Sequence, residues 1–222
     1  MKVQTALEGE VSIPENGERL SGELIVPAGA KAIAVFAHGS GSSRHSPRNK
    51  FVADVIRRHG VGTLLFDLLT REEEAIDLQT RHLRFDIGLL AKRLVSAVRW
   101  LANKPETAHL KIGFFGSSTG GGAALVAAAE LGELSGAVVS RGGRPDLAGD
   151  ALTNVRCPVL LIVGGLDDVV IRLNEQALAQ LNCEKKLQIV PGATHLFEEP
   201  GKLELVAELA ADWFERHLSF DR

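Results

Sequence analysis

The residues most able to do chemistry form the short segment Gly116-Ser117-Ser118-Thr119-Gly120, which matches the pattern G-x-S-x-G. When a strand precedes this pattern and a helix follows it, its central serine lies at the apex of a sharp turn. The backbone at that apex is strained, so the residues two positions away on either side must lack bulky side chains, and both are glycines here. The segment therefore predicts that Ser118 is a nucleophile.

A serine hydroxyl attacks efficiently only when a base takes its proton, so a histidine and an orienting carboxylate are required elsewhere in the fold. Asp167 and Asp168 follow the apolar run at 158–165, and His195 follows the next apolar run at 185–190. Either aspartate could orient the histidine at this point. The order serine, aspartate, histidine along the chain is the order found in α/β-hydrolases.

Acyl transfer also needs hydrogen-bond donors for the oxyanion that develops on the carbonyl oxygen. The backbone N–H of Thr119, directly after the nucleophile, is the first expected donor. The second is expected in the loop after the apolar run at 31–38, which reads HGSGSS, and we predict that it is Ser40. His38 is expected to support that loop.

The elements that position these residues can be inferred from hydropathy. Six short runs are continuously apolar, which is typical of parallel strands that are covered on both faces. Amphipathic segments at 85–103 and 203–218 have apolar residues at helical spacing. The pattern is that of a doubly wound α/β sheet. The six runs are 31–38, 60–67, 110–116, 135–140, 158–165 and 185–190.

Two further β segments, 9–14 and 19–27, precede these runs, and Asn16-Gly17 between them is a strong hairpin signal. A chain of 222 residues with 45% hydrophobic content can bury one substantial core. The sequence therefore predicts a single domain over residues 1–222. Its predicted fold is α/β, with about eight mostly parallel strands, an N-terminal antiparallel hairpin, helices on both faces and no large lid.

The segments FAHGSGSSRHSPRN, GFFGSSTGGG, LIVGGLDDVV and PGATHLF occur in the order and context of an α/β-hydrolase. Over nearly its whole length the chain resembles the dienelactone hydrolase-like group. The resemblance implies a serine hydrolase with the triad Ser118, Asp167 and His195, because the common family spacing G-x-x-D-x-x-V fits Gly164, Asp167 and Val170. The family's namesake has a cysteine nucleophile, whereas the apex here is a serine. The chain is also similar to hydrolase modules that some chains fuse to a phosphoribosyltransferase.

Arg141 and Arg144 follow the strand after the nucleophile helix, and loops at the carboxyl ends of parallel strands line the active crevice. They are either solvated or point into the crevice. A guanidinium in the crevice would bind a carboxylate or phosphate. The resemblance points the same way, because that group includes enzymes that act on substrates with a free carboxylate. We therefore expect a small-molecule substrate that can be anionic.

The charge balance predicts neither a nucleic-acid nor a membrane partner, because 25 Lys and Arg face 28 Asp and Glu without long like-charge runs. Residues 1–20 are too charged for a secretory signal, which predicts a cytoplasmic protein. The apolar stretch 112–129 has the length of a membrane span. Its many glycines, serines and threonine fit a strand, a turn and a helix better, since each glycine weakens a helix by about 1 kcal/mol.

No cofactor or metal is expected. GSSTGGG lacks the Gly-Lys-Ser/Thr ending of a phosphate loop, and GSGSSR lacks the third glycine of a dinucleotide-binding turn. Cys157 and Cys183 lack the spacing of a metal or redox pair, and no set of histidines and carboxylates shows metal-ligand spacing. The sequence leaves the oligomeric state open.

Two functions of different classes remain. The first is hydrolysis of an ester, lactone or thioester through an acyl-enzyme on Ser118. The second is a catalytically silent hydrolase fold that acts as a binding or interaction module.

Overall fold

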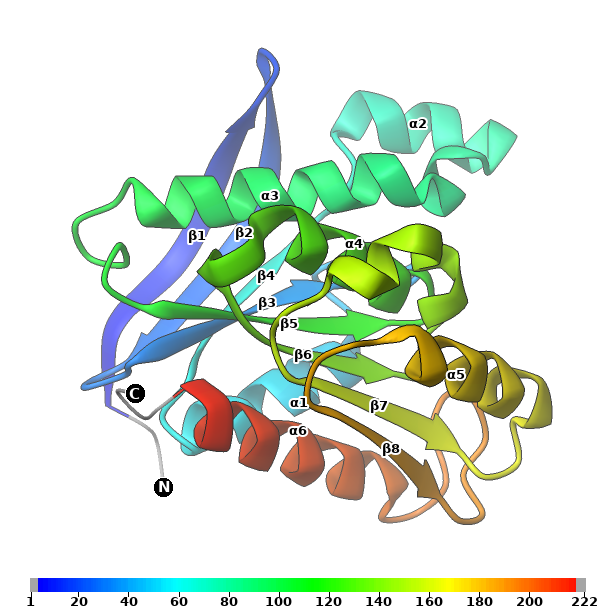
Figure 1. Ribbon diagram of the computed structural model, residues 1–222. Helices are drawn as coiled ribbons and strands as arrows, with labels where there is room; N and C mark the ends of the chain where they lie inside the picture. Colours follow the sequence, from blue (N-terminus) through cyan, green and yellow to red (C-terminus); the bar gives the residue numbers. More distant parts are fainter. Residues whose placement is uncertain (1–3, 219–222) are drawn as a thin grey trace.

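The computed structural model describes residues 4–218, which form an eight-stranded sheet between two layers of helices (Figure 1). The strand order is β1-β2-β4-β3-β5-β6-β7-β8. Neighbours from β4 to β8 pair in parallel, and β1 and β2 are antiparallel to their neighbours. The strands are β1 Thr5–Glu15, β2 Glu18–Pro27, β3 Ala32–Ala37, β4 Gly62–Phe66, β5 Lys111–Ser117, β6 Ser135–Arg141, β7 Val159–Gly164 and β8 Lys185–Val190. The predicted sheet is thereby confirmed.

The predicted N-terminal hairpin is present, and it forms one edge of the sheet. Asn16 and Gly17 have φ values of 47° and 88°, which is the left-handed pair that a two-residue hairpin turn requires. Glu15 pairs with Glu18 across the turn, and the ladder continues along both strands. Strand β2 then pairs with β4 and joins the hairpin to the parallel part of the sheet.

The helices divide between the two faces of the sheet (Figure 1). Helices α1 (Pro47–Arg58) and α6 (Lys202–Leu218) pack on one face. Helices α3 (Ile87–Ala102), α4 (Thr119–Leu131) and α5 (Asp168–Gln180) lie on the other. The central strands β3, β4 and β7 are buried along their whole length, which is why they read as continuous apolar runs. Short 3-10 segments are η1 (Leu83–Phe85), η2 (Gly132–Leu134) and η3 (Pro145–Asn154).

Helix α2 (Arg71–Thr80) is attached to the rest of the fold mainly by polar contacts. Asp77 is its only buried residue, while Leu78 is 69% exposed. The helix starts at a capping box in which Thr70 and Glu73 bond each other's backbone N–H groups. Because its few apolar residues form no buried face, hydropathy did not predict this helix.

Within residues 4–218 no helix has both the length and the apolar character needed to cross a bilayer.

Candidate active site

Ser118 occupies a strained turn between β5 and α4. Its φ of 51° and ψ of −122° lie outside the regions that L residues usually adopt. A side chain at Gly116 would come within 2.5 Å of the Gly120 carbonyl oxygen, and one at Gly120 would overlap the carbonyl of Ala37. The two glycines therefore let strand, turn and helix approach closely enough to hold the serine at the apex.

Asp167 and His195 meet at the carboxyl ends of β7 and β8. The Nδ1 atom of His195 lies 2.7 Å from Oδ2 of Asp167. Asp168 is the first residue of α5 and is exposed, so the aspartate that bonds the histidine is the one favoured by the G-x-x-D-x-x-V spacing. With Nδ1–H donating to the carboxylate, Nε2 of His195 is the ring nitrogen that can accept a proton.

The end of β6 connects the predicted nucleophile turn, residues 116–120, to the loop that carries His195. The N–H of Ser118 donates to the carbonyl of Arg141 at 3.3 Å. The next residue, Gly142, packs against the histidine: a Cβ there would lie 3.0 Å from the His195 carbonyl oxygen and 3.6 Å from Cε1 of its ring. Ser118 and His195 thus contact two adjacent residues, Arg141 and Gly142, at the carboxyl end of β6.

The predicted oxyanion loop, residues 38–43, packs directly against the turn that carries Ser118. A Cβ at Gly39 would lie 3.1 Å from the Cβ of Ser118. The N–H of Ser40 donates to the Thr119 hydroxyl at 3.0 Å. The N–H of Thr119 lies in the first turn of α4, where helical N–H groups have no intrahelical acceptor. The two predicted oxyanion donors are therefore neighbours, and one of them is bonded to the side chain of the other.

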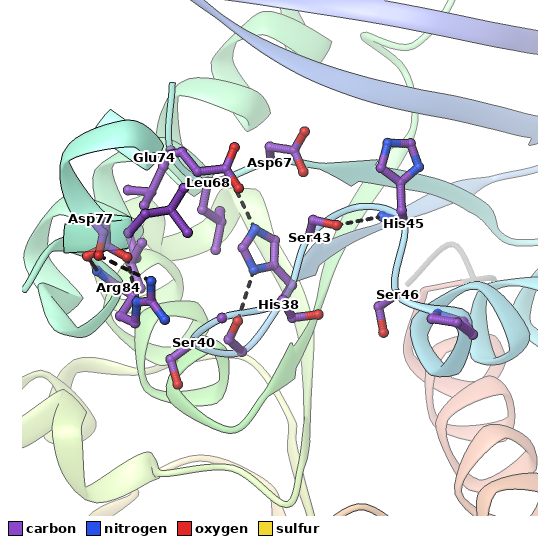
Figure 2. Close-up of a pocket in the computed structure, with 17 residues that line it drawn as sticks. His38, Ser40, Ser43, His45, Ser46, Asp67, Leu68, Glu74, Asp77 and Arg84 are labelled. Atoms are coloured by element: carbon purple, nitrogen blue, oxygen red, sulfur yellow. Dashed lines mark hydrogen bonds and ion pairs between the residues drawn. The ribbon is translucent and has the colours of Figure 1, made fainter. Parts of the chain in front are cut away.

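His38 supports the oxyanion loop, as expected. Its Nδ1 lies 3.1 Å from the Gly39 carbonyl oxygen, and Nε2 accepts a 3.1 Å hydrogen bond from the N–H of Leu68 (Figure 2). Because an N–H can only donate, Nε2 must be unprotonated and Nδ1 must carry the proton. Burial lowers the pKa of His38, which favours the same neutral form.

Arg141 is a buried cation that has no counterion among the described residues. Its residue is 7% exposed, and its Nη2 lies 3.4 Å from Oδ1 of Asn49. No hydrogen-bond partner satisfies its Nε or Nη1 within residues 4–218, and no carboxylate there pairs with it. Burial, followed by the charge of Arg48, lowers its pKa to about 10. A buried guanidinium without an anionic partner is able to bind an anion.

Arg144 differs from Arg141 because its charge is already paired. Its Nε and Nη2 donate to the two carboxylate oxygens of Asp146 at 2.8 and 2.7 Å. This bidentate bond raises the pKa of Arg144. Its backbone N–H donates to the Ser118 carbonyl at 3.0 Å, so the backbone of Arg144 contacts the nucleophile turn.

A separate cluster of titratable side chains lies where α1 and α6 meet, away from the predicted triad residues. His59, which caps α1, lies 3.0 Å from a carboxylate oxygen of Glu215 and 3.1 Å from one of Glu208. Ligand atoms of His59, Glu215 and Asp212 lie within 4.8 Å of one another. Sequence spacing could not reveal this group, because the histidine and the acids are about 150 residues apart.

The comparisons with known proteins identify the family and the fold of this chain. The model of the dienelactone hydrolase family matches residues 21–221. A crystal structure of dienelactone hydrolase from Anabaena variabilis is 61% identical, with a TM-score of 0.94 over 97% of this chain and 99% of that one. The predicted α/β-hydrolase fold is thereby confirmed. Est1E from Butyrivibrio proteoclasticus shares the fold, at 17% identity and a TM-score of 0.79 over 96% of this chain and all of that one.

A longer relative is also similar. A Mycobacterium tuberculosis protein that is provisionally named a phosphoribosyl transferase is 57% identical over 209 residues. The match covers 94% of this chain and 46% of that protein. The chain therefore spans about half the length of this relative.

Proposed function

The chain belongs to the dienelactone hydrolase family, and we propose that it cleaves an ester, lactone or thioester of a small molecule through an acyl-enzyme on Ser118. The observation that carries this proposal is the 2.7 Å bond from His195 to Asp167 beside a serine held at φ 51°. A strained serine next to an oriented imidazole is the arrangement that activates a hydroxyl.

In the proposed reaction Nε2 of His195 takes the Ser118 proton while Oγ bonds to the carbonyl carbon. The tetrahedral intermediate then breaks its bond to the alcohol or thiol, which leaves with the proton from His195. Water, activated by the same imidazole, cleaves the acyl-enzyme and releases the acid. Asp167 holds the imidazole in the orientation and tautomer that both steps need.

The oxyanion would be stabilised from the first turn of α4 and from the oxyanion loop. The N–H of Thr119 is the first donor. Ser40 contributes through its bond to the Thr119 hydroxyl, which leaves the hydroxyl proton of Thr119 free to point at the oxyanion. Fixed donors of this kind stabilise developing charge without reorganisation.

An anionic part of the substrate would lie toward β6, near Arg141. Burying a guanidinium with two unsatisfied nitrogens destabilises the fold through lost solvation. The charge of a bound carboxylate or phosphate would offset that loss. Arg144 is a weaker candidate because Asp146 already occupies its paired donors.

A fluorophosphonate probe tests the proposal against the alternative of a silent binding module. The probe bonds only to an activated serine, so intact-mass analysis should find one adduct in the wild type and none in Ser118→Ala. An unlabelled wild type, tested at a pH where the imidazole is neutral, would favour the binding module.

A further inference from the structure

A cavity of about 380 Å³ lies beside the oxyanion loop (Figure 2). One wall is the loop itself together with residues 45–47 at the start of α1. The opposite wall comes from residues 67–69 after β4 and from the α2 region. Gly39 and Ser40 line the cavity and also contact Ser118 and Thr119. The cavity therefore lies close to Ser118.

The position of this cavity indicates which half of a substrate it would hold. The leaving oxygen must receive its proton from His195, so the leaving group lies toward β7 and β8. The cavity lies on the other side of β5, over the ends of β3 and β4, and neither His195 nor Asp167 lines it. The acyl group is therefore the half that fits here.

The charges on the cavity wall disfavour an anionic acyl group. Asp67 accepts hydrogen bonds from the N–H and the guanidinium of Arg44, and Asp77 accepts them from those of Arg84. Glu74 also lines the cavity, and no cation within residues 4–218 pairs with it. The wall is thus net negative, and a carboxylate that entered would meet like charge at short range.

The remaining wall combines carbon surface with hydrogen-bonding groups. Leu68 and Leu90 are buried and present an apolar side, together with the half-buried Leu69. The hydroxyls of Ser40 and Ser42 make no side-chain hydrogen bond to any described residue. An aliphatic chain that bears hydroxyl groups would contact the leucines with its carbons and bond the serines and Glu74 with its hydroxyls.

We propose that this cavity binds the acyl group of the substrate, and that this acyl group is uncharged and carries at least one hydroxyl, which donates to Glu74. The inference rests on the proposed acyl-enzyme. Ser118 Oγ bonds to the carbonyl carbon of a hydroxyacyl ester, the alcohol leaves with the proton from His195, and water then releases the hydroxy acid.

Three ethyl esters that share one leaving group test the inference: ethyl butanoate, ethyl 3-hydroxybutanoate and monoethyl succinate. The release of acid is followed in a pH-stat. The wild type should have a kcat/KM about threefold to tenfold higher on the hydroxybutanoate than on the butanoate, and its lowest value on the succinate. Glu74→Gln keeps the size of the side chain and removes its charge. It should reduce the hydroxyl preference and raise the kcat/KM on the succinate by about threefold or more.

Glu72→Gln is the matched control, because Glu72 is exposed on the same helix and lies outside the cavity wall. Its three rates should equal those of the wild type. Equal rates on butanoate and hydroxybutanoate, or ratios that Glu74→Gln leaves unchanged, would overturn the inference. So would a protein that the fluorophosphonate labels at Ser118 but that cleaves none of the three esters. An unlabelled protein would instead overturn the proposed function.

Discussion

The N–H of Ser40 and the hydroxyl of Thr119 are joined by a 3.0 Å hydrogen bond that links the oxyanion loop to the first turn of α4. Thr119→Val keeps the shape of the side chain and removes both the acceptor for Ser40 and the hydroxyl proton. We expect kcat to fall about tenfold, less than the 10²–10³ typical for a primary oxyanion donor. Thr119→Ser should restore the rate. A Thr119→Val enzyme as fast as the wild type would show that the Thr119 hydroxyl does not stabilise the oxyanion.

Ser118→Ala should abolish hydrolysis and probe labelling without loss of thermal stability, because the glycines around Ser118 determine the geometry of the turn. Ser117→Ala is the comparison. The Ser117 hydroxyl is buried and donates to Asn49 at 3.1 Å, so its removal should cost about 1 kcal/mol of unfolding free energy and little activity. Activity that survives in Ser118→Ala and disappears in Ser117→Ala would move the nucleophile by one residue.

Asp167→Asn should lower kcat strongly, because an amide no longer fixes the tautomer of His195. The equivalent change in a serine protease lowers kcat about 10⁴-fold. Asp168→Asn should stay within about twofold of the wild type, since Asp168 is exposed and does not bond the histidine. Steady-state kinetics on one ester are sufficient, and similar losses in the two variants would remove the distinction between the aspartates.

Arg141→Met should lower kcat/KM about tenfold on an ester whose alcohol half carries a carboxylate, and much less on its neutral isostere. Since the buried charge has no counterion among residues 4–218, the same change should leave the melting temperature unchanged or raise it. Arg144→Ala should affect the two esters alike. A wild type that does not distinguish the charged ester from the neutral one would contradict a substrate-binding role for Arg141.

His59→Gln should destabilise the protein in acid but not in base. Burial alone would lower the pKa of His59, but the hydrogen bonds and charges of Glu215 and Glu208 outweigh it and raise that pKa. The folded state therefore binds the proton more tightly than the unfolded chain, whose histidine pKa is about 6.5. The stabilisation is complete below that value and disappears as the pH rises through the folded pKa.

Thermal melts of wild type and His59→Gln across this range measure that difference. The carboxylates are about half exposed, so the difference should be small and should shrink in about 1 M salt. A difference that grows toward alkaline pH would show that His59 acts through packing rather than through charge.

Much of this structure could be predicted from the sequence, because its parts obey local rules. The hairpin turn follows from Asn16-Gly17, the buried strands from continuous apolar runs, and the turn at Ser118 from its flanking glycines. These features depend on residues that are neighbours in the chain, or on backbone conformations that few residue types allow.

The features that could not be predicted depend on contacts between distant segments. Ser40 bonds Thr119 across 79 positions, and the cation of Arg141 is buried beside a residue of α1. Neither contact leaves a periodic signal in the sequence. Helix α2 was missed for the opposite reason: it buries too little to need an apolar face.

The weak attachment of helix α2 affects the dynamics of the cavity wall beside Ser118. Helix α2 is fixed by the ion pair of Asp77 with Arg84 and by the bond from Arg93 to Glu73, rather than by a buried apolar face. Segments with few buried apolar contacts open at a small fraction of the global unfolding free energy. The backbone amides of α2 should therefore exchange with deuterium long before those of α3 and α4, and the wall can rearrange around a bound molecule while the nucleophile turn stays rigid.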